Sequence, residues 1–294
     1  MIIIININWD DLSNLFEDSW WLNNMKREYR PLNDGNSEEI LDPQETLLLE
    51  GYSLWFDESF TNLSDKDKEI FINKKISQTK DKEEEKSLYI TLTELFYHTK
   101  QFKKINKISD YIIETYKEDL LYTSVFHYYK GVSCIEVENF EEAVENLLIA
   151  DQLNPNQHEY IRQLGYAYFC LGEQFDSDEF IDKWILLLKR ALNMTPEDLQ
   201  EDIEQDLQFC FEYEKEKGLS HLKNEDYKSA LNSFQRISEL KVKNLNKEEI
   251  NSYLWYTKYM NGNKNEWLKM LKENFNKSSV NLKFKKNMIK LLKQ

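Results

Sequence analysis

The stretch from Ser124 to Pro155 carries the spacing that decides the fold, and it runs SVFHYYKGVSCIEVENFEEAVENLLIADQLNP. Counted from Gly131, an aromatic residue stands at +9, small residues at +12 and +19, a large apolar residue at +16 and a proline at +24. These residues are Phe140, Ala143, Ala150, Leu147 and Pro155. Small residues let two helices approach closely, and proline ends a helix because it has no backbone N–H to donate. The stretch therefore predicts two antiparallel helices packed as a hairpin.

The same spacing occurs in two further places. Counted from Gly218, the matching residues are Tyr227, Ala230, Phe234, Ile237 and Val242. Counted from Gly165, the start fits, but the end fits only after seven extra residues, at Trp184, Leu188, Ala191 and Pro196. Three of the chain's seven glycines occupy this one packing position, which favours true repeats over chance.

This pattern resembles the tetratricopeptide repeat, a helix–turn–helix unit of 34 residues. The resemblance implies an all-α fold, a right-handed α-solenoid of helical hairpins preceded by an N-terminal helical region. We expect three parts: an N-terminal helical region at 1–80, repeats at 81–246 and C-terminal helices that cap the solenoid at 247–294. A degenerate repeat is expected at Ser87 to Lys117. The acidic segment from Glu197 to Gln208 is expected to extend a helix.

The two ends of the chain give weaker indications. Asp42-Pro43-Gln44-Glu45 is a helix start, with an N-cap aspartate followed by proline at the first helical position. Ser64 is a second candidate N-cap, and Lys80 to Lys86 is either a linker or an exposed first turn. Ile2 to Ile5 could form a short strand or a docking tail, and both remain open. The residues after Asn263 are basic, which favours a solvated capping helix over a contact surface.

The composition limits the classes of partner. The net charge of −15 disfavours nucleic acid and anionic membranes, since phosphate binding needs clustered Lys and Arg. A basic protein or peptide is the expected partner, and the oligomeric state stays open. Cys134, Cys170 and Cys210 are odd in number and not paired in spacing, which predicts reduced thiols in the cytoplasm. The richness in Asn, Lys and Ile indicates a bacterial source.

Sequence motifs of catalysis are not found. The chain has neither a glycine-rich phosphate loop nor a His-Glu-x-x-His pair. His98, His127, His158 and His221 lie far apart in sequence, and no cysteine has a histidine at metal-site spacing. We therefore expect no catalytic residues, no metal and no cofactor, and a protein that is not an enzyme.

The resemblance also implies which residues bind a partner, because repeat positions 2, 5, 9 and 12 line a groove in this family. The residues implied as partner-binding are Val125, Tyr128, Val132 and Ile135 in the first clear repeat, Glu159, Arg162, Tyr166 and Phe169 in the second, and Lys215 and Leu219 in the third. Family members that grip a terminal carboxylate use lysine and asparagine at positions 5 and 9. Tyr128 and Val132 stand there in the first repeat, so that clamp is absent. Two interpretations of these aromatic residues are equally favoured: the groove is open to a partner, or the chain's own N-terminal helices cover some of the aromatic side chains.

Two functional hypotheses follow. One is a non-catalytic interaction protein, in concrete form a bacterial immunity protein or antitoxin that binds and neutralises a basic toxin domain. The alternative is a regulatory receptor or adaptor that binds a peptide in the groove. An enzyme with a site assembled from distant residues is a third, less favoured class.

Overall fold

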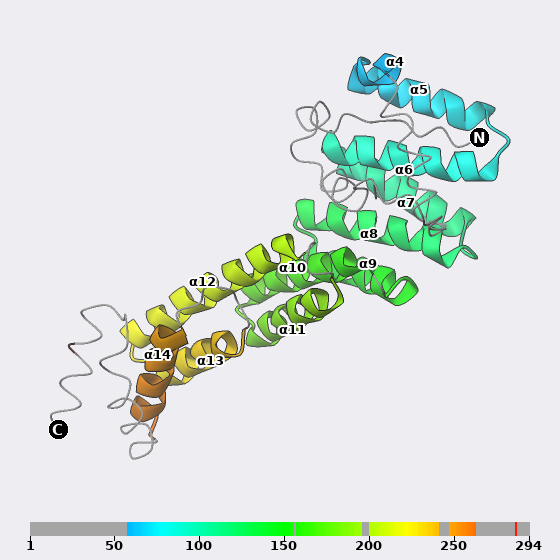
Figure 1. Ribbon diagram of the computed structural model, residues 1–294. Helices are drawn as coiled ribbons and strands as arrows, with labels where there is room; N and C mark the ends of the chain where they lie inside the picture. Colours follow the sequence, from blue (N-terminus) through cyan, green and yellow to red (C-terminus); the bar gives the residue numbers. More distant parts are fainter. Residues whose placement is uncertain (1–57, 156, 196–199, 241–246, 263–285, 287–294) are drawn as a thin grey trace, which may run out of the picture. The chain divides into compact units, whose positions relative to one another are not determined.

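The computed structural model describes residues 58–155, 157–195, 200–240, 247–262 and 286, and these are all-helical and contain no strand. Figure 1 shows the helices in chain order. They are α4 Glu58–Thr61, α5 Asp65–Gln78, α6 Lys82–His98, α7 Phe102–Thr115, α8 Leu120–Glu136, α9 Phe140–Leu153, α10 His158–Phe175, α11 Asp178–Met194, α12 Glu201–Lys223, α13 Tyr227–Ser238 and α14 Lys247–Met260. The expected all-α class is confirmed.

The described residues belong to two compact units, one ending at Ile108 and the other starting at Ser109. The domain boundaries expected from the sequence stay predictions. The helix start at Asp42, the segment Ile2 to Ile5 and the basic residues after Asn263 lie outside the described residues.

In the first unit, α5 packs against α6. Ser64 caps α5 as predicted, since its hydroxyl oxygen accepts a hydrogen bond from the Asp67 backbone N–H. Asp81 caps α6 in the same way through Glu83. The charged run from Lys80 to Lys86 is therefore the exposed first turn of α6 rather than a linker, as its acidic first-turn residues favour.

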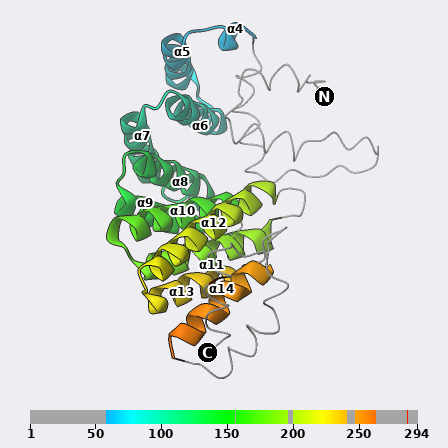
Figure 2. The same ribbon diagram turned by 90° about the vertical axis from the view of Figure 1, so that its left-hand side faces the viewer.

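The second unit is a solenoid of stacked helical hairpins. α8 pairs with α9, α10 with α11 and α12 with α13, and α14 packs on α13. Ion pairs join the second helices of successive hairpins: Arg190 of α11 binds Asp151 of α9 at 2.6 Å, and Arg236 of α13 binds Asp182 of α11 at 2.6 Å. Figure 2 shows the second helices α9, α11 and α13 following one another in that order.

The turn within each hairpin repeats one backbone geometry. A non-glycine residue with positive φ stands in each turn: Glu138, Asp176 and Glu225. The next residue's N–H bonds to a carbonyl five residues back, from Asn139 to Cys134, Ser177 to Gly172 and Asp226 to His221. This is the Schellman closure, which satisfies carbonyls at the end of the first helix. The same closure, through Lys100 and Gln101, joins α6 to α7 inside the expected degenerate repeat.

The glycines of the first and third clear repeats lie where the spacing predicts. A Cβ on Gly131 would stand 2.5 Å from Leu147 Cγ and 3.2 Å from the Ala143 carbonyl oxygen. A Cβ on Gly218 would stand 2.9 Å from the Phe234 ring. Real Cβ atoms do not approach other atoms so closely, so the pairing of the two helices depends on glycine at both positions.

The second clear repeat has a different register from the one expected. No inserted segment separates its helices, because α10 ends at Phe175 and α11 begins at Asp178. Its turn lies 38 residues after that of the first repeat, from Cys134 to Gly172, and the first lies 38 residues after Phe96. Gly165 does contact Trp184, and Gly172, missed in the sequence, contacts Ile181. The expected seven extra residues are wrong because two glycines, two helical turns apart, share the packing role.

The acidic segment before the third repeat is a helix extension, as expected, in its described part. α12 begins at Glu201, so the residues up to Gln208 add about two turns to the helix. At the other end of the unit, Phe234 of α13 stacks on Tyr253 of α14 with ring centroids 5.2 Å apart. This contact carries the buried core beyond the last repeat.

Candidate functional site

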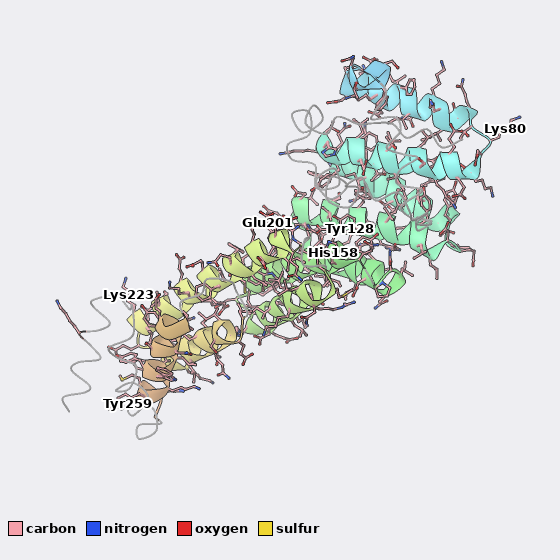
Figure 3. The ribbon with its side chains drawn as sticks, viewed as in Figure 1. Lys80, Tyr128, His158, Glu201, Lys223 and Tyr259 are labelled. Carbon is pink, nitrogen blue, oxygen red and sulfur yellow. The ribbon has the colours of Figure 1, made fainter. Side chains whose placement is uncertain are left out.

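The first helices of the hairpins form a row in which aromatic side chains make the contacts. Tyr128 of α8 stacks on Tyr160 of α10 with centroids 4.9 Å apart. Phe169 of α10 meets Tyr213 of α12 edge to face at 5.2 Å. α8, α10 and α12 are therefore neighbours, and Figure 3 shows the side chains of α12 between its labelled first and last residues, Glu201 and Lys223. The residues implied by the family resemblance lie along this row.

On α8 the implied residues are buried. Val125, Tyr128, Val132 and Ile135 are each at most 8% exposed. α8 is buried on nearly every face between Tyr122 and Ile135, which suits a central core helix. These four side chains contribute no open surface in this structure, and their role as partner-binding residues stays a prediction.

At the start of α10, Glu159 and Arg162 belong to an internal ion cluster. Arg162 donates to both Glu159, at 3.3 Å, and Asp206 of α12. Glu159 is 3% exposed and also accepts from Gln163 at 2.7 Å. Burial raises the pKa of Glu159 to about 7, against the opposing effect of the Arg162 charge. The cluster ties α10 to α12, so these two side chains are engaged with each other.

Further along α10, Tyr166 and Phe169 lie on an exposed aromatic surface. Phe169 stacks on Tyr166 at 6.1 Å and meets Phe209 of α12 edge to face at 5.4 Å. Tyr166 is 46% exposed and Phe209 is 50% exposed, whereas Trp184 beneath them is buried. We call Tyr166, Phe169, Phe209 and Tyr213 the aromatic patch. An exposed group of large rings is costly in water and marks contact surfaces.

Carboxylates surround the aromatic patch. The Tyr213 hydroxyl donates to Glu173, and burial together with this carboxylate raises the pKa of Tyr213. The pKa of Tyr166 is raised too, by burial, then by Cys170, and then by Glu136 and Asp206. Glu136 is the last residue of α8, so acids from three helices act on the patch. The surface combines apolar rings with negative charge.

The implied residues of the third repeat contact other parts of the chain. The Lys215 ammonium lies 3.7 Å from Glu249 of α14 and over the Phe211 ring. Leu219 is half-buried and packs against the core that α10 to α14 share. Of the ten implied residues, Tyr166 is thus the exposed aromatic one, and it stacks on the half-buried Phe169.

Phe209 and Tyr213 were missed by sequence reasoning. Phe209 directly follows the acidic segment that ends at Gln208, and neither Phe209 nor Tyr213 occupies one of the repeat positions 2, 5, 9 and 12. Their i, i+4 spacing on one helix was the signal that could have found them, because such residues share a face.

The described residues offer little for catalysis. They contain no group of three or more His, Cys, Asp and Glu side chains able to hold a metal ion. The His127 Nδ1 atom lies 3.2 Å from the Asn146 side-chain oxygen, and burial lowers the pKa of His127. His221 lies 3.6 Å from Asp226 at a turn. The three cysteines are free, and burial raises the pKa of the Cys134 thiol to about 11.

Within the described residues, no helix combines the length and apolar character that crossing a bilayer requires.

Comparison with known proteins assigns the chain to no family. No protein-family profile and no curated protein sequence matches the chain. Among solved structures, the apo form of the quorum sensor NprR from B. thuringiensis is similar over 85% of this chain and 81% of its own, with 13% identity and a TM-score of 0.34. The helical-repeat assignment therefore rests on the hairpins of the chain itself.

Proposed function

We propose that the chain is a non-catalytic binding protein that holds an extended segment of a polypeptide partner on the aromatic patch. The observation that carries the proposal is the exposure of Tyr166 and Phe209, 46% and 50%, on two adjacent helices of a repeat scaffold. Aromatic residues dominate the energy of protein interfaces, and helical repeats present extended surfaces for that purpose. The sequence resemblance to tetratricopeptide repeats agrees with this role.

A short segment suits this surface better than a folded domain. A stable complex of two domains buries about 800 Å² on each partner. The implied groove residues of α8 are buried, and Glu159 and Arg162 pair with each other. The open part of the row is therefore confined to one stretch of α10 and α12. Of the two hypotheses from the sequence, the peptide-binding receptor or adaptor is favoured.

The partner's positive charge and the reducing compartment belong to the same proposal. The net charge of −15 and the acids around the patch support a basic partner. The three free cysteines support a cytoplasmic protein. The immunity protein that neutralises a basic toxin domain stays a prediction, supported by the acidic charge alone.

Selection of random peptides displayed on phage against the full chain tests the proposal. We expect enriched peptides whose affinity falls about tenfold or more in the variant Tyr166→Ser/Phe209→Ser, as truncation of interface anchors does. The control is Ile149→Ser/Leu186→Ser, which removes two exposed apolar residues from α9 and α11. Failure to enrich any peptide, or equal losses in the two variants, would contradict the proposal. Circular dichroism confirms that both variants are folded.

A further inference from the structure

Lysine side chains lie over several aromatic rings of the described residues, but not over those of the aromatic patch. Elsewhere, Lys104 lies 4.7 Å from the centroid of Phe96, and Lys183 lies 5.3 Å from Tyr168 and 5.2 Å from Phe180. Within the described residues, no lysine or arginine lies over Tyr166, Phe169, Phe209 or Tyr213. The faces of exposed aromatic rings attract cations, so the patch can accept a cation from a partner.

The charges of α10 and α12 also favour a cation at the aromatic patch. α10 and α12 carry nine acidic side chains and four basic ones. Three of the four cations are already bound to acids: Arg162 to Asp206, Lys215 to Glu249 and Lys217 to Asp176. The helices that form the patch thus hold negative charge in excess, next to the exposed rings of Tyr166 and Phe209.

We propose that the patch is an arginine-binding site, in which the partner's segment places a guanidinium over the rings of Tyr166 and Phe209, beside the carboxylates of Glu136 and Glu173. This inference rests on the proposed function and names the side chain that the bound segment must carry. Arginine fits better than lysine because its planar guanidinium is weakly hydrated, stacks on rings and binds carboxylates with two hydrogen bonds. Rings and acids from α8, α10 and α12 recognise the same group, so specificity depends on the spacing of successive repeats.

The test uses the tightest peptide from the phage selection and a copy in which citrulline replaces each arginine in turn. Citrulline has nearly the same shape without the charge. At one position, we expect the replacement to weaken binding at least about threefold, the effect of an exposed cation–π contact. Calorimetric titration of the full chain measures both affinities.

Variants locate the effect. Phe209→Leu keeps an apolar side chain and removes the ring, so the preference for arginine over citrulline should shrink. Phe175→Leu is the matched control, since Phe175 is 54% exposed and lies outside the patch. Glu136→Gln should also reduce the preference for arginine over citrulline, because Glu136 is an exposed acid beside the aromatic patch.

The outcomes separate this inference from the function beneath it. Peptides that bind through the patch but carry no arginine, or tolerate citrulline at every position, would overturn the arginine site and leave the binding function standing. A preference for arginine that persists in Phe209→Leu would also overturn it. Enrichment of no peptide at all would remove both.

Discussion

At the scale of single residues, the glycine at the contact between paired helices is the most constrained position. Gly131→Ala would place a methyl group against Leu147 and the Ala143 carbonyl. Overpacking costs about 1–3 kcal/mol, while alanine favours a helix over glycine by about 1 kcal/mol. We expect a net loss in the free energy of unfolding, measured by urea denaturation. Ser220→Ala, at an exposed position of α12, is the control, and a Gly131→Ala variant more stable than wild type would contradict the close approach.

A second prediction concerns Glu159 and the dependence of stability on pH. Its folded-state pKa of about 7 lies above the ordinary value, so the folded chain binds more protons than the unfolded chain between about pH 4.5 and 7. The contribution of Glu159 to the free energy of unfolding therefore falls as the pH rises through that window. Burial lowers the pKa of His98, His127 and His158, and these histidines have the opposite effect. The difference between wild type and Glu159→Gln isolates the carboxyl group.

We expect the Glu159→Gln variant to gain stability relative to wild type as the pH rises from about 5 to about 8, because only wild type acquires a buried charge. Thermal unfolding in a series of buffers measures the difference. A difference that stays constant or shrinks with pH would show that Glu159 is ionised throughout and that Arg162 dominates its environment.

At the scale of helices, Arg236 joins α13 both to α11 of the preceding hairpin and to α12 of its own hairpin. Arg236 of α13 contacts Asp178 at 3.1 Å and Asp182 at 2.6 Å on α11, and Glu214 of α12 at 3.4 Å. Glu214 is fully buried, and its Oε1 atom has no hydrogen-bond partner among the described residues. Its charge is compensated through Arg236.

Arg236→Met should therefore destabilise the chain by about 3–5 kcal/mol, because it leaves Glu214 buried and without its partner. The double variant Arg236→Met/Glu214→Met should recover a large part of that loss. Glu179→Gln, which breaks the exposed pair with Lys183, should change the stability far less. Chemical denaturation compares the three, and no recovery in the double variant would contradict the pairing.

The helix scale also shows what the sequence could predict. The packing of Gly131 and Gly218 followed from local spacing, because a hairpin brings together residues close in sequence. The burial of Val125 and Tyr128 did not, since it depends on what packs on the other faces of α8. The ion pair between Arg162 and Asp206 was likewise not predictable from local spacing. It joins residues 44 positions apart in the sequence, and their contact depends on the length of α12. Half of the aromatic patch was thus predictable from the sequence. Tyr166 and Phe169 followed from the repeat positions, whereas the place of Phe209 and Tyr213 depends on α12 lying beside α10.

At the scale of the whole molecule, the acidic surface should govern how fast a basic peptide arrives. A net charge of −15 attracts cationic partners over a distance that salt shortens, from about 30 Å at 0.01 M ionic strength to about 3 Å at 1 M. We expect the association rate constant of an arginine-bearing peptide to fall about tenfold or more between low and high salt, with a smaller change in its dissociation rate. Stopped-flow fluorescence measures both, and an association rate independent of salt would count against electrostatic steering.

Photocrosslinking of the selected peptide tests the location of the binding surface most directly. Benzoyl-phenylalanine replaces Phe209 in one preparation of the full chain and Leu186, which is 66% exposed on α11, in another. We expect an efficient crosslink from position 209 and little from position 186, and excess unlabelled peptide should suppress the crosslink from position 209. A crosslink from position 186 that equals or exceeds the one from position 209 would show that the peptide does not bind at the aromatic patch.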